Sequence, residues 1–286
     1  MPSQRDLSIN HRLLDACLTG ARAGAAYIRS RVHDLPAIDW HEKSRSDFVS
    51  EVDLGAEDRI GDVLRKAVPE AVVVGEEHTP THSPGAEVAF IVDPLDGTTN
   101  FLHGYPQYAV SIAAAVHGVV SAAVVLDVPR NAEYSATLGG GAWRDGAELR
   151  VSRIDQPERA LIGTGFPFKD VDRIAPYLPQ FQRVVSQVAG VRRAGSAALD
   201  LADVAAGRFD AFWELMLAPW DMAAGLLLVR EAGGRVTGLD GVDIGPAHTP
   251  VVASNGLMHP WLLSQLGSTG AGASATLHSS TAHRLP

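Results

Sequence analysis

The chain has 286 residues, of which 46% are hydrophobic and 20% charged, and its formal net charge is −9. This length allows one large domain or two lobes, and the apolar fraction is sufficient for a packed core. The negative charge argues against nucleic acid as a partner, because a phosphate backbone requires a basic surface. A single cysteine, Cys17, allows no intramolecular disulfide. We recognise neither a signal peptide nor a membrane-spanning segment in the sequence and therefore expect a cytoplasmic protein without a membrane partner.

The first half of the chain predicts helices followed by a series of strands. Apolar residues recur at helical spacing over 9–32 and 53–68, and the polar residues 39–50 between them predict a loop or a hairpin. Short β-rich runs predict strands over 71–74, 88–92, 108–115, 119–127, 133–138 and 141–144. Helices followed by strands indicate an α+β lobe, to which we assign residues 1–151.

From residue 152 onward, predicted strands and helices alternate. The strands cover 160–164, 191–194, 209–214, 235–237 and 250–253, and the helices cover 174–189, 196–206 and 222–232. Such alternation is typical of an α/β lobe, to which we assign residues 152–266. Residues 267–286 are mostly Gly, Ser, Thr and Ala without periodicity, so we predict a disordered tail there.

The most informative segment is Asp93-Pro94-Leu95-Asp96-Gly97-Thr98-Thr99-Asn100-Phe101. It places two carboxylates three positions apart at the end of the apolar strand predicted over 88–92, where open α/β sheets usually carry their chemistry. Two nearby carboxylates repel, a divalent cation removes that conflict, and oxygen ligands of this kind suit Mg²⁺. The following glycine and threonines offer N–H groups and hydroxyls to an anion. Metal and anion together suggest phosphate chemistry, although an ordinary Asx-turn explains the same residues taken alone.

Other acidic residues follow predicted strands or start predicted helices, namely Glu76-Glu77, Asp221 and, in the polar stretch, Asp47. Each one alone is more often a turn or cap residue. Several of them converging in one cleft would be tolerable only with cations present. The sequence contains no P-loop, no nucleophile elbow and no zinc-binding H-E-x-x-H helix.

Three motifs together resemble the inositol monophosphatase family, within the wider group of lithium-sensitive, magnesium-dependent phosphatases. They are Gly75-Glu76-Glu77, Asp93 to Phe101, and Trp220-Asp221-Met222-Ala223-Ala224-Gly225. Gly195-Ser196-Ala197-Ala198 and Glu214 lie where the family places substrate contacts. The resemblance spans roughly Ala16 to Val252, is closest to bacterial members, and implies a layered αβαβα sandwich of the sugar-phosphatase type.

The resemblance implies roughly two to three Mg²⁺ ions per subunit. One would be held by Glu76, Asp93 and the backbone carbonyl of Leu95. A second would be held by Asp93, Asp96 and Asp221, and Glu76 would help to hold a third, weaker ion.

The resemblance also implies catalytic and substrate-binding residues. Thr98 and Asp47 would orient and deprotonate the attacking water, and Glu76 is counted with them as catalytic. Phosphate would be bound by the backbone N–H groups of Gly97 and Thr98 and by the Thr98 hydroxyl. The remaining implied substrate contacts, on the alcohol side, are Gly195, Ala197, Glu214 and Asp221.

The pair Thr99-Asn100 resembles the monophosphatase branch of the wider group. We therefore predict a magnesium-dependent phosphomonoesterase that hydrolyses inositol 1-phosphate, or a similar polyol or sugar monophosphate, by direct attack of water. Histidinol phosphate and fructose 1,6-bisphosphate are alternative substrates, the latter requiring a basic group that the sequence does not identify. A non-catalytic, metal-binding regulatory protein is the alternative of another class. Lithium inhibition and a homodimer are expected from the resemblance alone.

Overall fold

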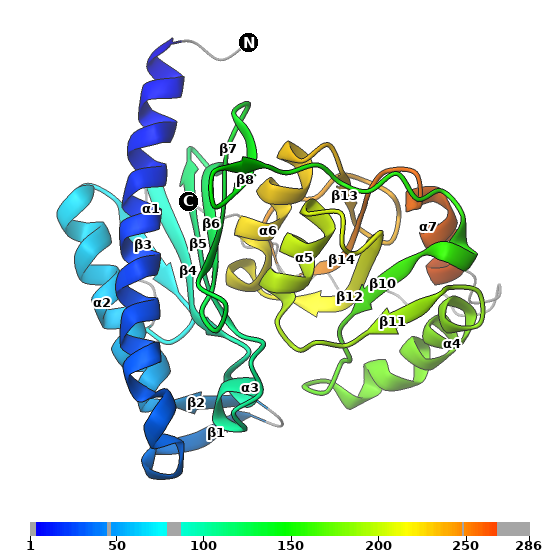
Figure 1. The fold of residues 1–286 in the computed structure, drawn as a ribbon, viewed down its shortest axis with the longest axis horizontal. Helices are drawn as coiled ribbons and strands as arrows, with labels where there is room; N and C mark the ends of the chain where they lie inside the picture. The colour runs from blue at the N-terminus through cyan, green and yellow to red at the C-terminus, as the bar shows by residue number, and fades with distance from the viewer. Residues whose placement is uncertain (1–3, 45–46, 79–86, 248, 268–286) are drawn as a thin grey trace.

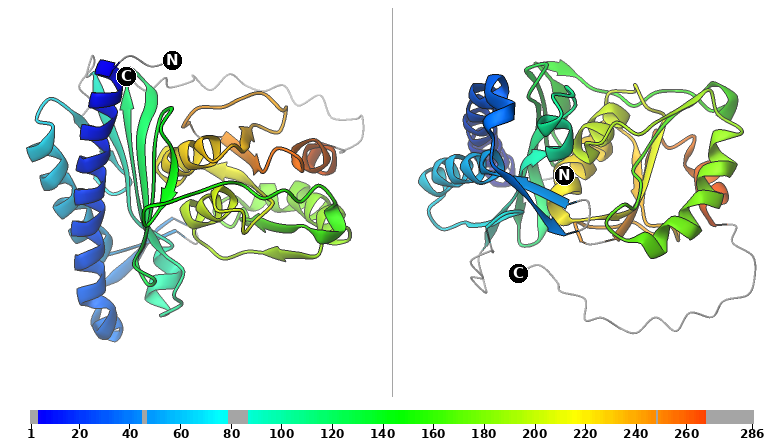
Figure 2. Two further views of the ribbon diagram at one scale, coloured as in Figure 1. Left: turned by 45° about the horizontal axis from the view of Figure 1, so that its top comes forward. Right: turned by 90° about the horizontal axis from the view of Figure 1, so that it is seen from below.

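The computed structural model describes residues 4–44, 47–78, 87–247 and 249–267, and its elements stack in the order αβαβα (Figure 1). Helices α1 (Gln4–Arg31) and α2 (Glu51–Ala67) form one outer layer and pack on a seven-stranded sheet. Helices α5 (Ala197–Ala205) and α6 (Pro219–Glu231) separate this sheet from a five-stranded one. Helices α4 (Ile174–Val185) and α7 (His259–Gly267) form the other outer layer. The predicted layered sandwich is confirmed, and Figure 2 shows the same layers from two further sides.

The seven-stranded sheet follows chain order and is antiparallel except for its first, parallel pair. Its strands are β3 (Val72–Gly75), β4 (Val88–Asp96), β5 (Ala109–Val116), β6 (Val119–Asp127), β7 (Ala132–Thr137), β8 (Gly141–Arg144) and β9 (Ala147–Glu148). Nearly every residue of β5 and β6 is buried, because helices cover both faces of this sheet. That double burial explains why these strands are continuous apolar runs rather than alternating ones.

The five-stranded sheet has the order β11-β10-β12-β14-β13. Its strands are β10 (Leu161–Thr164), β11 (Gly190–Arg192), β12 (Ala211–Leu217), β13 (Arg235–Thr237) and β14 (Thr249–Ser254). Strand β10 pairs in parallel with β11 and β12, whereas β14 is antiparallel to β12 and β13. The two sheets thus use strands before residue 149 and after residue 160 respectively. The proposed boundary at 151/152 and the disordered tail stay predictions, since residues 268–286 lie outside the described part.

Smaller elements complete the fold next to the two sheets. Residues 39–50 contain a hairpin of β1 (Trp40–Ser44) and β2 (Asp47–Ser50), one of the two forms predicted there. A short helix, α3 (Thr98–Leu102), follows β4. Three 3₁₀ helices cover Val32–Ala37, Pro157–Arg159 and Val171–Arg173.

Several element ends differ from the sequence prediction for identifiable reasons. Helix α2 begins two residues early because Ser50 caps it and the Asp53 carboxylate accepts a hydrogen bond from the Ser50 backbone N–H. Helix α6 begins at Pro219, since proline suits the first helical position. Helix α4 ends at Val185 rather than at 189, because the chain enters β11 at Gly190. Helix α7 was not predicted; it is only 9 residues long and carries no acidic first turn or basic last turn.

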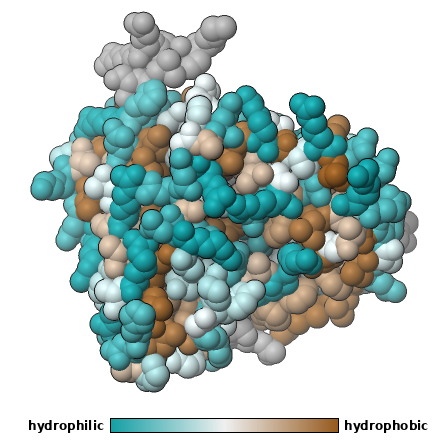
Figure 3. Space-filling view, viewed as in Figure 1, coloured by the Kyte–Doolittle hydropathy of each residue, from teal (hydrophilic) through white to brown (hydrophobic). Residues whose placement is uncertain are grey.

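Hydrophilic side chains cover much of the face drawn in Figure 3, with smaller apolar patches between them. Two exposed apolar side chains, Leu178 and Val185, lie on the outer helix α4. No helix among the described residues combines the length and the hydropathy that a membrane crossing requires.

Candidate metal centre

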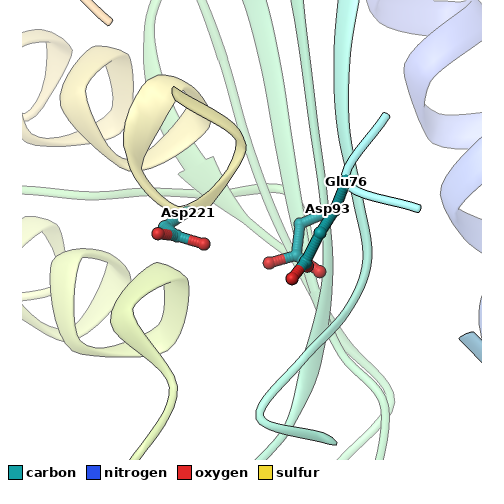
Figure 4. Close-up of side chains that lie close together, drawn as sticks. All are labelled: Glu76, Asp93 and Asp221. Carbon is teal, nitrogen blue, oxygen red and sulfur yellow. The ribbon is translucent and has the colours of Figure 1, made fainter. Parts of the chain in front are cut away.

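Three carboxylates from three different elements meet between the seven-stranded sheet and helix α6. Glu76 follows β3, Asp93 lies on β4, and Asp221 lies in the first turn of α6. Each offers an oxygen, and these oxygens all lie within 4.8 Å of one another. Figure 4 shows the Asp221 carboxylate facing those of Glu76 and Asp93 across the gap.

A break in the β4–β5 ladder shapes the segment that carries Asp93 and Asp96. The register shifts between these two residues, so Pro94 lies where no regular ladder hydrogen bond is required. The Asp93 carboxylate then accepts a hydrogen bond from the Leu95 N–H at 3.0 Å. Asp96 reaches the other lobe, where it accepts hydrogen bonds from the Ser196 hydroxyl at 2.6 Å and the Ala198 N–H at 2.7 Å. The Asp93 and Asp96 carboxylates are therefore held by hydrogen-bond partners on different sides of the same site.

The loop that carries Glu76 is fixed by the buried carboxylate of Glu57 on α2. Glu57 accepts hydrogen bonds from the backbone N–H groups of Glu77 at 2.9 Å and His78 at 3.1 Å. A Cβ atom at Gly75 would lie 2.0 Å from the Glu57 carboxylate, so only glycine fits there. The sequence analysis did not identify Glu57, because an acid within an amphipathic helix carries no distinctive signal.

Asp221 is oriented by the start of its own helix. Its carboxylate accepts a hydrogen bond at 2.7 Å from the N–H of Ala218, which lies three residues earlier at the N-terminus of the helix. The preceding residue is tied to the sheet, because the Ser111 hydroxyl donates to the Trp220 carbonyl at 3.2 Å. Helix α6 thereby presents Asp221 to the sheet in a fixed direction.

The acids of this centre resist ionisation in the absence of a cation. Burial raises the pKa of Asp93 well above its usual range, and the charges of Glu76, Asp96 and Asp221 raise it further. Burial, followed by the charge of Glu76, raises the pKa of Asp221 to about 8. Burial likewise raises the pKa of Asp96 to about 6, despite its hydrogen bonds from Ser196 and Ala198.

One lysine lies beside the acidic centre. The Lys43 ammonium is 2.5 Å from a Glu77 carboxylate oxygen and 3.4 Å from an oxygen of Glu76. Burial and the charge of Glu76 nevertheless raise the pKa of Glu77 to about 7. Closely spaced oxygen donors with raised pKa values fit a hard divalent cation, because such an ion compensates several negative charges at once.

Glu76, Asp93, Asp96 and Asp221 line a cavity of about 660 Å³. The predicted site residues along this cavity are Glu76, Asp93, Leu95, Asp96, Gly97, Thr98, Gly195, Ala197, Glu214 and Asp221. Asp47 lies on strand β2, and its side chain is outside the described part of the chain. The roles assigned to all these residues stay predictions, whereas their gathering around one cavity is a feature of the fold.

The Thr98 hydroxyl has an acidic partner that the sequence analysis assigned only to the start of a helix. It donates to the Asp53 carboxylate at 2.7 Å and to the Leu95 carbonyl at 3.1 Å. Asp53 is 1% exposed and also accepts hydrogen bonds from the backbone N–H and the hydroxyl of Ser50. Burial raises the pKa of the Asp53 carboxylate. The spacing Ser50-x-x-Asp53 is a capping-box pattern, and this signal could have identified Asp53 as a fixed residue.

Gly97 connects β4 to α3 with a backbone that requires glycine. Its φ angle is +100°, in the left-handed region. A Cβ atom at this position would lie 2.9 Å from the Gln107 carbonyl and 3.2 Å from the Gly195 carbonyl. The Asn100 amide reinforces this junction by donating to the carbonyls of Gln107 and Ala194. The loop that lines the cavity is thus held from both lobes.

Aromatic and basic side chains, together with Glu214, also line the cavity. The Arg193 guanidinium lies 4.9 Å from the ring centroid of Phe168 and 5.9 Å from that of Phe166. Lys169 also lines the cavity. Burial, followed by the charge of Asp221, raises the pKa of Glu214 to about 8. Sequence analysis had located no basic residue here, because neither cation belongs to a motif.

Fold and site together define a two-sheet sandwich with an acidic candidate metal centre between its lobes. The family model described as the inositol monophosphatase family matches residues 10–271. This chain belongs to the inositol monophosphatase family.

Individual relatives carry two kinds of name. The Nus factor SuhB of Pseudomonas aeruginosa is 49% identical over 233 residues, covering 80% of this chain and 86% of that protein. The crystal structure of the extragenic suppressor protein suhB from Bartonella henselae superposes with a TM-score of 0.87 at 37% identity, covering 90% of this chain and 99% of that one. Inositol monophosphatase from Anabaena gives a TM-score of 0.78 at 32% identity, with coverages of 89% and 95%.

Proposed function

We propose that this protein is a magnesium-dependent phosphatase that hydrolyses inositol 1-phosphate or a similar polyol or sugar monophosphate. The observation that carries the proposal is the meeting of Glu76, Asp93 and Asp221 within 4.8 Å in a cavity between the lobes. Family membership supports it, because phosphatases of this family share the layered fold and the three motifs.

Residues of this chain would hold the cations in the way that the resemblance implies. Glu76, Asp93 and the Leu95 carbonyl would hold one Mg²⁺, and Asp93, Asp96 and Asp221 a second. The chemistry supplied by bound Mg²⁺ is neutralisation of phosphate charge and a lowered pKa for a water molecule. The raised pKa values of Asp93, Asp96 and Asp221 support the assignment, since these groups lack a compensating charge of their own.

Water would be oriented by Thr98 and Asp53. Because the Thr98 hydroxyl donates its hydrogen to the Asp53 carboxylate, its lone pairs are available to accept a hydrogen from water. A proton taken from that water would pass through Thr98 to Asp53. We therefore propose Asp53 for the basic role in addition to Asp47, the residue that the resemblance suggested.

The phosphate and the alcohol would occupy opposite ends of the cavity. The backbone N–H groups of Gly97 and Thr98 would donate to phosphate oxygens, which fits the fixed geometry of their loop. Glu214, Gly195, Ala197 and Asp221 would contact hydroxyls of the alcohol, because carboxylates and carbonyls accept hydrogen bonds from them.

Fructose 1,6-bisphosphate gains support as an alternative from Arg193 and Lys169. These cations line the same cavity and could bind a second phosphate. Histidinol phosphate remains the other alternative substrate. The Nus factor names of relatives support a regulatory role by association as the alternative of another class.

Phosphate release separates these possibilities. The purified protein is stripped of metal with chelator, supplied with Mg²⁺, and offered inositol 1-phosphate, histidinol phosphate and fructose 1,6-bisphosphate. We expect magnesium-dependent release that is fastest with inositol 1-phosphate. Undiminished hydrolysis after metal removal would contradict the metal assignment, and no release from any substrate would favour the regulatory alternative.

Three further expectations accompany this proposal. Lithium should inhibit phosphate release. Sedimentation equilibrium should report a homodimer, and cell fractionation should recover the protein in the cytoplasm. None depends on the choice of substrate.

A further inference from the structure

Asp200 on helix α5 is a buried acid with one carboxylate oxygen that has no hydrogen-bond partner among the described residues. Its side chain is 2% exposed, and its Oδ1 atom accepts no hydrogen bond from any residue that the structure describes. The residue nevertheless lines the cavity between the lobes. A carboxylate oxygen removed from water without a donor is strongly unfavourable, so a ligand that supplies one would be bound well.

The geometry of α5 explains why Asp200 faces the cavity. Ser196, Ala197 and Asp200 are related by helical spacings of three and four residues and therefore share one face. All three line the cavity, while Leu199 and Leu201 are buried in the hydrophobic core. Asp200 thus occupies the cavity face of a helix that also packs Leu199 and Leu201 into the hydrophobic core.

Packing alone does not account for an acid at this position. Among the buried acids of the described chain, Asp127 accepts hydrogen bonds from Arg130, and Asp210 accepts them from Ser152 and Leu161. Asp200 alone among them retains a buried oxygen that no hydrogen bond reaches. One turn further along α5, the carboxylate of Asp203 accepts a hydrogen bond from Arg208 at 2.7 Å.

The neighbours of Asp200 extend the argument to Glu214 on β12. Glu214 lines the same cavity, and its negative charge raises the pKa of Asp200 after burial itself. The Arg193 guanidinium lines the same cavity, and its positive charge lowers the pKa of both acids. Two carboxylates that share one cation leave acceptor oxygens for a donor from outside the protein.

We propose that Asp200 and Glu214 form a donor-accepting subsite, in which two carboxylates bind hydrogen-bond donors on the alcohol part of the substrate. The substrate accordingly carries at least two such donors on that side, either hydroxyls of a polyol or an ammonium group. This inference rests on the proposed phosphatase function and names Asp200 as an additional substrate-binding residue within it.

The test compares substrates with and without donors. Variants Asp200→Asn and Asp200→Ala are assayed with Mg²⁺ on inositol 1-phosphate, histidinol phosphate and p-nitrophenyl phosphate, which has neither hydroxyl nor ammonium donors. The measured quantity is the ratio of kcat/KM for each donor-bearing substrate to that for p-nitrophenyl phosphate. We expect Asp200→Ala to lower this ratio about tenfold or more, and Asp200→Asn to lower it less, since the amide keeps one acceptor oxygen.

The substrate whose kcat/KM ratio falls identifies the kind of donor that the subsite binds. A lower ratio for inositol 1-phosphate identifies hydroxyls, and a lower ratio for histidinol phosphate identifies an ammonium group. The matched control is Asp203→Asn, which removes a carboxylate from the same helix outside the cavity and should leave both ratios unchanged. Circular dichroism melting of each variant separates loss of fold from loss of selectivity, and the near-isosteric Asn variant keeps the test valid if the Ala variant unfolds.

Two outcomes overturn the inference and are distinguishable. Unchanged ratios in folded Asp200 variants, with an active wild-type protein, contradict the subsite alone. No phosphate release by the wild-type protein from any of the three substrates contradicts the proposed function, and the subsite with it.

Discussion

Replacement of Asp53 by asparagine should lower turnover severely while leaving the protein folded. The Asp53 carboxylate accepts three hydrogen bonds, from the Ser50 N–H at 2.8 Å, the Ser50 hydroxyl at 2.5 Å and the Thr98 hydroxyl at 2.7 Å. Asparagine keeps the shape but replaces one acceptor oxygen by a donor. That donor would face either the Ser50 N–H or the Thr98 hydroxyl, so one of these contacts is lost or reversed.

Both consequences can be given a magnitude. Losing one charge-assisted hydrogen bond at a helix N-terminus costs about 1–3 kcal/mol of unfolding free energy. Losing the base that accepts a proton through Thr98 should lower kcat about a hundredfold or more, the usual range for general-base catalysis. The effect on kcat therefore exceeds what a stability change of this size causes in a protein that is still folded at the assay temperature.

Initial rates of phosphate release at saturating Mg²⁺ measure the loss, and chemical denaturation measures stability. Ser50→Ala is the matched control, because it removes the capping hydroxyl and leaves the Asp53–Thr98 contact. It should cost about 1 kcal/mol of stability, and it should lower kcat much less than Asp53→Asn does, because the Ser50 hydroxyl donates to the Asp53 carboxylate but leaves the base in place. If Asp47→Asn abolishes turnover and Asp53→Asn does not, the assignment to Asp53 is wrong and the acid suggested by the family resemblance is the base.

Three other predictions concern the acidic centre and the C-terminal lobe. Asp93→Asn should lower kcat at least about a hundredfold. In chelator the same change should raise the melting temperature, since it removes one of several repelling charges. An unchanged kcat would contradict the role of Asp93 as a metal ligand. Adding Mg²⁺ at about 100 times its Kd should stabilise the chelator-treated protein by about 2.7 kcal/mol. Differential scanning calorimetry would detect this as a rise of several degrees in the melting temperature. An unchanged melting temperature would argue against metal binding. His259 is fully buried between Thr237 and Ser254, and its pKa is lowered to about 4 by burial. Below about pH 6.5 the unfolded chain binds a proton at His259 and the folded chain does not. The contribution of neutral His259 to stability is therefore complete above pH 6.5 and declines as the pH falls toward 4. Denaturation from pH 4 to 7 should show a shallower pH dependence of stability in His259→Asn than in the wild-type protein.

The sequence predicted the strands of the seven-stranded sheet well because their signals are local and strong, whereas the layered arrangement was implied by the family resemblance. The strands of the seven-stranded sheet are buried on both faces, so their runs of apolar residues were unmistakable. Helix ends were less predictable, since they depend on single capping contacts such as Ser50 with Asp53. The short helix α7 escaped prediction because its position is set by packing on α4 and β14 rather than by its own sequence pattern.

The candidate site was predictable where a motif carried it and unpredictable elsewhere. Asp93 and Asp96 drew attention by their spacing after a predicted strand, Asp221 did so by its place at the start of a predicted helix, and all three stand in motifs of the family that the chain resembles. Glu57 and Asp200 act from within helices, where an acid normally faces solvent, and only the tertiary fold reveals that they are buried. Such residues become recognisable through what surrounds them, which a single sequence does not contain.

The acidic centre links the two halves of the molecule through charge, in addition to the apolar packing of helix α6 on the seven-stranded sheet. Glu76 and Asp93 belong to the seven-stranded sheet, whereas Asp221 begins a helix that also packs against the five-stranded sheet. Without a cation their mutual repulsion opposes close approach of these elements, as the raised pKa values indicate. A divalent ion held by all three would reverse that repulsion and draw helix α6 toward the sheet. Metal binding should therefore stabilise the contact between the lobes as well as the site itself, and amide hydrogen exchange at the first turn of α6 should slow when Mg²⁺ is added.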